Sequence, residues 1–272
     1  MTHLATPDSP LVWETVSRAL TRRGPVTEAS RVDLRDLDLR PTLELVRVIN
    51  AEDGTVAEAV GAAAPQLAAA IDAIVERLRA GGRLIYVGAG SSGRLAALDA
   101  AECGPTFSAA PGQVVAVLAG GFEAAAVAQE TAEDDAEAGA TDLAALDVGP
   151  ADAVVALSAS GRTPYTLGAL VHAAEAGALT VAVVNVRGSE LGRAAEREVA
   201  VEVGPEVISG STRMKAGTAQ KLVLNTISTI AMVQLGKTFG NLMVDVQASN
   251  EKLRARARRA VALATGSSEE EV

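Results

Sequence analysis

The chain has few of the residues on which several classes of site depend. One cysteine, Cys103, is present in 272 residues, so no internal disulfide can form, which fits a reducing cytoplasm. The two histidines, His3 and His172, are isolated and show no metal-ligand spacing with Cys103, so we expect no metal site. Aromatic residues make up only 2% of the chain, which favours closely packed alanine-rich helices over aromatic binding faces.

An excess of basic charge is also missing. The net charge is −10, and nucleic-acid binding needs clustered Lys and Arg, so we expect no nucleic-acid partner. No apolar run is long enough to span a membrane, and the first ten residues lack the basic and apolar blocks of a signal peptide. We therefore expect a cytoplasmic protein with no membrane contact.

What the chain does contain is a series of short apolar runs separated by helical patterns. Five runs read as buried strands, and this alternation is typical of a parallel sheet covered by helices on both faces. The sequence therefore predicts an α/β fold, a doubly wound five-stranded parallel sheet. The five predicted strands are residues 83–87, 114–118, 153–157, 179–184 and 199–203.

Helical additions are expected at both ends of this sheet domain. We predict an N-terminal helical arm over residues 1–54, the α/β domain over 55–246, and a C-terminal helix and tail over 247–272. Single helices are expected at residues 11–23 and 246–265, and one continuous helical pattern covers residues 123–146. A long helical pattern over residues 55–80 is expected to kink or restart at Pro65. The helix after the first strand should end near residue 101, and a short helix is expected at residues 191–197.

The first glycine-rich turn follows the first predicted strand. Its glycines are Gly88, Gly90 and Gly93, with Ser91 and Ser92 between them, and a helical segment follows. A dinucleotide site would need an acidic residue at the end of the next strand, and that strand ends in Leu-Ala-Gly-Gly. NAD is therefore disfavoured, and the two serines suggest a smaller, sugar-like ligand.

A second hydroxyl-rich turn follows the third predicted strand. Ser158, Ser160 and Thr163 surround Gly161 just before a helix. Hydroxyl groups and free N–H groups at a helix N-terminus suit a phosphate monoester. The alternative is an ordinary helix cap without a ligand, although a cap needs only one hydroxyl. Both turns are expected at the carboxyl ends of parallel strands, where α/β sheets bind ligands.

Two glutamates are candidates for acid–base chemistry. Glu102 ends a mostly apolar helical segment, and a carboxylate in apolar surroundings can act as a general acid. Glu133 lies in an acidic cluster, Glu-Asp-Asp. From residue chemistry alone, a surface position is the favoured reading of both. The segment 211–221 adds Arg213, Lys215 and Lys221 as local cations for an anion, or as ordinary helix-start residues.

Long motifs give the chain a family resemblance. They span residues 42–45, 49–53, 82–95, 98–103, 159–165, 210–225 and 240–245. With them the chain resembles the N-acetylmuramic acid 6-phosphate etherases, which belong to the sugar isomerase (SIS) domain superfamily. The resemblance implies an SIS, flavodoxin-like sandwich. It also implies cleavage of a D-lactyl ether to give N-acetylglucosamine 6-phosphate and D-lactate, by elimination and then hydration.

The resemblance also assigns roles to residues. Glu102 matches the family glutamate that is expected to give a proton to the leaving lactate. Glu133 matches the one that is expected to remove the proton from carbon 2. The phosphate loop of the superfamily falls on Ser158, Ser160 and Thr163, and its first-turn serine on Ser92. Neither a metal nor a cofactor is implied. A homodimer is expected, because the superfamily usually builds its sites between subunits.

Three departures from the family pattern stand out. Phe122 replaces a usual glutamate, and Gly104 replaces a usual proline. Members commonly continue well beyond the position of Gly266, so oligomer stability or site closure could differ here. Two rivals to the etherase remain open: a sugar-phosphate-sensing module, like the related glucokinase regulatory protein, and a sugar-phosphate isomerase.

Overall fold

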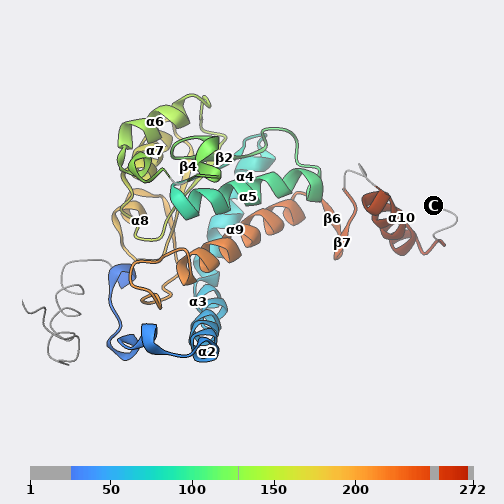
Figure 1. Ribbon diagram of the computed structural model, residues 1–272. Coiled ribbons are helices and arrows are strands. Elements are labelled where there is room, and N and C mark those ends of the chain that lie inside the picture. Colours follow the sequence, from blue (N-terminus) through green and yellow to red (C-terminus); the bar gives the residue numbers. More distant parts are fainter. Residues whose placement is uncertain (1–25, 128, 246–250, 269–272) are drawn as a thin grey trace, which may run out of the picture.

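The computed structural model describes residues 26–127, 129–245 and 251–268, and its centre is a five-stranded parallel sheet. The strand order β2-β1-β3-β4-β5 is that of the flavodoxin-like doubly wound fold, which confirms the predicted fold class (Figure 1). The strands are β1 (Leu84–Gly88), β2 (Val114–Leu118), β3 (Ala153–Ser158), β4 (Leu179–Val184) and β5 (Arg197–Ala200).

The apolar runs form strands because both faces of the sheet are buried. Within β1, Leu84 and Tyr86 belong to one hydrophobic cluster, and Ile85 and Val87 belong to another. The first cluster is completed mainly by α4 (Ala64–Arg79) and α9 (Lys215–Gln234), and the second by α6 (Ala136–Ala144) and α7 (Pro164–Glu175). Side chains that alternate between two covered faces explain why the strands are apolar throughout rather than at every second residue.

The long helical pattern before β1 forms two helices. These are α3 (Val56–Ala62) and α4, and Pro65 occupies the first turn of α4, where its missing N–H is not needed. The predicted restart at Pro65 is therefore confirmed. The helix after β1 is α5 (Gly90–Phe107), which continues through Pro105, whereas we expected it to end near residue 101.

The expected continuous helix over residues 123–146 is wrong. The chain instead forms two 3₁₀ turns, η4 (Phe122–Ala125) and η5 (Glu130–Asp134), and then α6. The Asp135 side chain accepts a hydrogen bond from the Ala138 N–H at 2.9 Å, so it caps a new helix. Alanine-rich composition suggested a helix, but this cap and the glycines before η4 divide the segment.

Other differences lie near the C-terminus. The short helix α8 (Glu190–Ala194) and β5 both begin earlier than expected, and β5 ends at Ala200. A small antiparallel hairpin of β6 (Thr238–Phe239) and β7 (Leu242–Met243) was not predicted. The last helix is α10 (Glu251–Thr265), which stands apart from the sheet layers in Figure 1. The predicted helix at 11–23 lies outside the described residues.

The N-terminal arm is bound to the sheet domain by an ion-pair triad. The arm contains the 3₁₀ turns η1 (Val26–Glu28), η2 (Val32–Leu34) and η3 (Leu37–Leu39), and α2 (Thr42–Asp53) follows. Glu52 of α2 pairs with Arg31 of the arm at 2.5 Å and with Lys215 of α9 at 2.6 Å. Because the Lys215 side chain is only 5% exposed, this triad fixes the arm beside the start of α9.

No single helix in the described part of the chain is long and apolar enough to cross a membrane. The segments Thr42–Ala62 and Ala64–Arg79 reach the length and apolar composition of a membrane span only when taken together, and a bend of 59° separates them.

We predict that Glu52→Gln destabilises the protein by about 3 kcal/mol at neutral pH, because Lys215 then stays buried without a carboxylate. Burial raises the pKa of Glu52, but hydrogen bonds from Arg31 and Lys215 outweigh it and hold that pKa below its ordinary value of 4.5. The stabilisation is therefore present above pH 4.5 and lost as the pH falls through the lowered pKa. Denaturant unfolding of both proteins at several pH values measures this.

The matched control is Arg187→Ala, which breaks the exposed pair between Arg187 and Glu202. We expect a loss below about 1 kcal/mol there. Equal effects of the two substitutions would contradict a structural role for the triad.

Candidate functional site

Both predicted hydroxyl turns lie at the carboxyl ends of neighbouring strands. β1 and β3 pair directly, with Gly88 opposite Leu157, so Ala89 and Ser158 lie next to each other at this end of the sheet. The helices that follow, α5 and α7, therefore begin at the same edge. In this strand order the β1–β3 boundary is the switch point at which α/β sheets bind ligands.

The glycines of the first turn bring α5 close to β1. A Cβ on Gly93 would lie 2.0 Å from Leu118 Cδ1 and 2.6 Å from the Gly88 oxygen, so no larger residue fits there. The Gly93 N–H bonds to Ala89, which leaves the N–H groups of Gly90, Ser91 and Ser92 at the open end of the helix. This end of α5 favours an anion.

The second turn is a hydrogen-bonded hydroxyl loop. Ser158 Oγ lies 2.9 Å from Thr163 Oγ1 and 3.4 Å from Ser160 Oγ, and it accepts the Gly161 N–H at 3.0 Å. Thr163 is the N-cap residue of α7 but makes no capping hydrogen bond with its side chain. The three hydroxyls therefore face one another instead of satisfying the helix end, which is unlike an ordinary cap.

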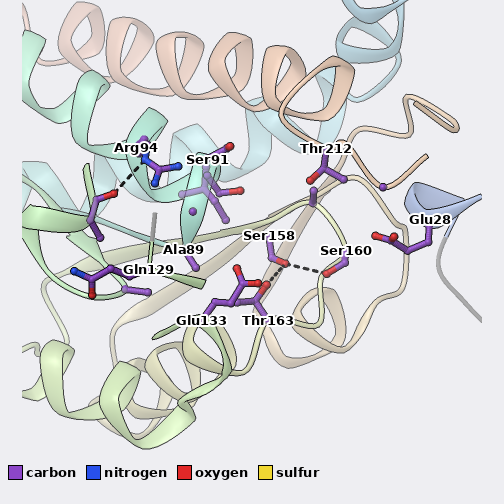
Figure 2. A pocket seen from close by; sticks show the side chains of 17 residues that line it. Glu28, Ala89, Ser91, Arg94, Gln129, Glu133, Ser158, Ser160, Thr163 and Thr212 are labelled. Carbon is purple, nitrogen blue, oxygen red and sulfur yellow. Dashed lines mark hydrogen bonds between the residues drawn. The ribbon is translucent and has the colours of Figure 1, made fainter. Parts of the chain in front are cut away.

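One cavity of about 430 Å³ lies between these two turns (Figure 2). It brings together six of the eight residues predicted for the site, Ser91, Ser92, Ser158, Ser160, Thr163 and Glu133. Gly161 lies within the loop, between Ser158 and Thr163, and its φ of +65° is in the left-handed region that favours glycine. The sequence reasoning missed four further lining residues with polar side chains, Glu28, Arg94, Gln129 and Thr212.

Glu133 enters this cavity from η5. Its Oε2 atom lies 3.9 Å from where a Cβ on Gly90 would be, so the carboxylate is next to the N-terminus of α5. Figure 2 shows Glu133 beside Thr163, below the hydroxyl loop. Glu133 can therefore face a ligand held by both turns.

Glu102 lies elsewhere in the single chain. It borders a second cavity of about 220 Å³ between α5 and α9, together with Leu98, Asp99 and Lys221. Glu102 lies twelve positions after Gly90 in α5. At a rise of 1.5 Å per residue, this is about 18 Å along the helix axis. One chain thus keeps the two glutamates apart, and Glu102 is exposed there rather than surrounded by apolar groups.

A buried network fixes the helix that carries Glu102. Asp99 accepts hydrogen bonds from Tyr86 at 2.9 Å, Asn225 at 2.7 Å and Ser228 at 3.1 Å, which ties α5 to β1 and α9. Burial, together with the charge of Asp99, raises the pKa of the neighbouring Cys103 thiol to about 12. The sulfur therefore stays a neutral thiol and is no nucleophile at neutral pH.

The segment 211–221 supplies less cationic charge than its sequence suggested. Thr212 lines the main cavity, but Lys215 pairs with Glu52 and Lys221 borders the second cavity. The departures Phe122 and Gly104 do not border the main cavity either.

Comparisons with known proteins decide the family. The chain is 63% identical over 246 residues to an N-acetylmuramic acid 6-phosphate etherase of Rubrobacter xylanophilus, covering 90% of this chain and 82% of the relative. The etherase of Streptomyces avermitilis is 57% identical, with 90% and 79% covered. This chain belongs to the N-acetylmuramic acid 6-phosphate etherase family.

Two family models match parts of the chain as well. The SIS domain model matches residues 125–230, and the model of the glucokinase regulatory protein N-terminal SIS domain matches residues 66–174. Solved structures agree on the fold. Phosphoheptose isomerases of Francisella tularensis and Neisseria gonorrhoeae superpose with TM-scores of 0.53 and 0.52 at 19% identity. They cover 73% and 70% of this chain and 100% and 99% of their own.

We predict that Gly161→Ala disorders the hydroxyl loop. A Cβ there would lie 2.0 Å from Ser189 Oγ, and the positive φ adds strain, so we expect a stability loss above about 2 kcal/mol and weaker sugar-phosphate binding. Gly204→Ala is the control, because Gly204 has a similar φ of +70° but open space around it. Unfolding curves and calorimetric binding compare them. Unchanged sugar-phosphate binding by Gly161→Ala would contradict the assignment of the hydroxyl loop as the phosphate site.

Proposed function

We propose that this chain is a lyase that cleaves the D-lactyl ether of N-acetylmuramic acid 6-phosphate. The products are N-acetylglucosamine 6-phosphate and D-lactate. The observation that supports this most is the joint opening of two hydroxyl-lined helix N-termini and Glu133 onto one cavity, in a chain of the etherase family. The phosphate would bind to the hydroxyls of Ser158, Ser160 and Thr163 and to nearby N–H groups.

The chemistry needs a base and an acid. In the open-chain sugar, carbon 2 is next to the aldehyde, and Glu133 removes its proton. The electron pair forms the carbon 2–carbon 3 double bond, and the lactate oxygen leaves carbon 3 with a proton from Glu102. Water then adds its oxygen to carbon 3 and gives a proton to the Glu102 carboxylate, and Glu133 returns a proton to carbon 2. The sum is substrate plus water giving two products, and no residue is changed.

A homodimer would bring the two glutamates to one sugar. Because α5 holds Glu102 about 18 Å from the Glu133 end of its own chain, the acid has to come from a second copy. The surface around Glu102 fits this, because Leu98 on the same helix is 56% exposed. Covering these groups with a second subunit would also provide the apolar surroundings that a carboxylic acid needs to stay protonated.

A regulatory role remains the second candidate, because residues 66–174 match the regulatory-protein SIS model. A regulator would bind the sugar phosphate without turning it over. The isomerase alternative is supported by likeness of fold alone. As an enzyme of sugar-phosphate metabolism with one buried thiol and no disulfide, the protein would act in the cytoplasm.

We predict D-lactate release when the purified protein is incubated with N-acetylmuramic acid 6-phosphate. Glu102→Gln and Glu133→Gln each remove one proton transfer, so each is expected to lower the rate by about 10²- to 10⁴-fold. Glu137→Gln, on the exposed start of α6, is the control and should keep full activity. Sugar-phosphate binding without lactate from the folded wild-type protein would favour the regulator.

We predict that the two inactive variants complement each other. A heterodimer of Glu102→Gln and Glu133→Gln chains, purified through two different tags, has one intact site in a two-fold dimer. It should recover about half of the wild-type activity. An inactive heterodimer would contradict a site shared between subunits.

A further inference from the structure

The N-terminal arm places a second carboxylate in the main cavity. Glu28 of η1 lines it together with the hydroxyl loop and Glu133. In Figure 2, Glu28 and Glu133 lie on opposite sides of that loop, and the Glu28 carboxylate points toward Ser160. Neither acidic motifs nor helix ends in the sequence draw attention to Glu28.

The arm holds Glu28 in this position through its main chain. Ser209 Oγ donates a hydrogen bond to the Glu28 carbonyl oxygen at 2.9 Å, and the neighbours Thr27 and Ala29 are 1% and 2% exposed. The carboxylate passes over bare backbone at Gly210, where a Cβ would lie 2.8 Å from Glu28 Oε2. Replacing the side chain therefore leaves the anchoring bond intact.

The charges around the cavity limit what Glu28 can do. The charged lining residues are Glu28, Arg94 and Glu133, and Arg94 Nε donates to the carbonyl oxygens of Ala124 and Ala125 at 3.1 and 3.2 Å. Two carboxylates and one guanidinium, whose Nε already donates to main-chain carbonyls, give these side chains a net negative charge, which opposes the binding of a bare anion. A ligand that also donates hydrogen bonds would gain from a carboxylate here.

We propose that Glu28 is a substrate-binding residue that accepts hydrogen bonds from hydroxyl groups of the bound sugar phosphate. Through it the cavity selects a hydroxyl-bearing phosphate ester over an anion without such donors. The identity of the sugar rests on the proposed function. The contact between Glu28 and a ligand hydroxyl group is inferred from the position of Glu28 in the cavity, across the hydroxyl loop from Glu133.

Calorimetric titration tests this with two probes, N-acetylglucosamine 6-phosphate and inorganic sulfate, a tetrahedral anion that carries no hydroxyl group at neutral pH. For Glu28→Ala we expect at least about tenfold weaker binding of the sugar phosphate, because hydrogen bonds to a charged group are strong ones. Binding of sulfate should stay equal or tighten, because a like charge is removed. Glu28→Gln keeps an acceptor oxygen and should fall between wild type and Glu28→Ala.

The control is Asp38→Asn, which removes a negative charge from an exposed residue of the same arm outside the cavity. It should bind both probes like the wild type. Equal weakening of both probes by Glu28→Ala, or no weakening, would overturn the proposal. Binding that depends on Glu28 in a protein that releases no lactate would support this proposal and contradict only the lyase function.

Discussion

Direct parallel pairing of β1 with β3 is the constraint on which the rest of the structure depends. It sets Gly88 against Leu157, so the two helices that follow begin at one edge of the sheet. Any strand order in which β1 and β3 were not neighbours would separate the two hydroxyl turns by at least one strand. The glycine-mediated approach of α5 to β1 then leaves the helix N–H groups accessible. The location of the cavity is thus set by the strand order, and the side chains determine only its lining.

An acidic protein can bind a phosphate in this way without clustered cations. Hydroxyl groups and helix N-termini supply positive ends of dipoles, and these need no net charge. The lysines that the sequence placed nearby serve other purposes, since Lys215 is paired with Glu52. Because the cavity itself holds two carboxylates, the ligand has to contribute hydrogen-bond donors. A phosphorylated sugar has both an anionic phosphate group and hydroxyl groups that donate hydrogen bonds.

The sequence allowed the sheet and both turns to be predicted, because apolar strands and glycine–serine turns are local patterns. It failed over residues 123–146, where the cap at Asp135 outweighs alanine-rich composition. It could not show that Glu102 and Glu133 lie apart in one chain, since that depends on the length of α5. Glu28 was missed because its position at the cavity depends on a hydrogen bond from Ser209, far along the chain, to its main-chain carbonyl. The domain limits at residues 54 and 246, and the assigned site residues, stay predictions.

A crystal structure of the protein with N-acetylglucosamine 6-phosphate would test the central claim most directly. We predict a two-fold dimer in which the phosphate lies within hydrogen-bonding distance of Ser158, Ser160 and Thr163. Carbons 2 and 3 should then lie between Glu133 of one chain and Glu102 of the partner subunit. A phosphate bound away from the hydroxyl loop, or a dimer that leaves both copies of Glu102 remote from the sugar, would contradict the account.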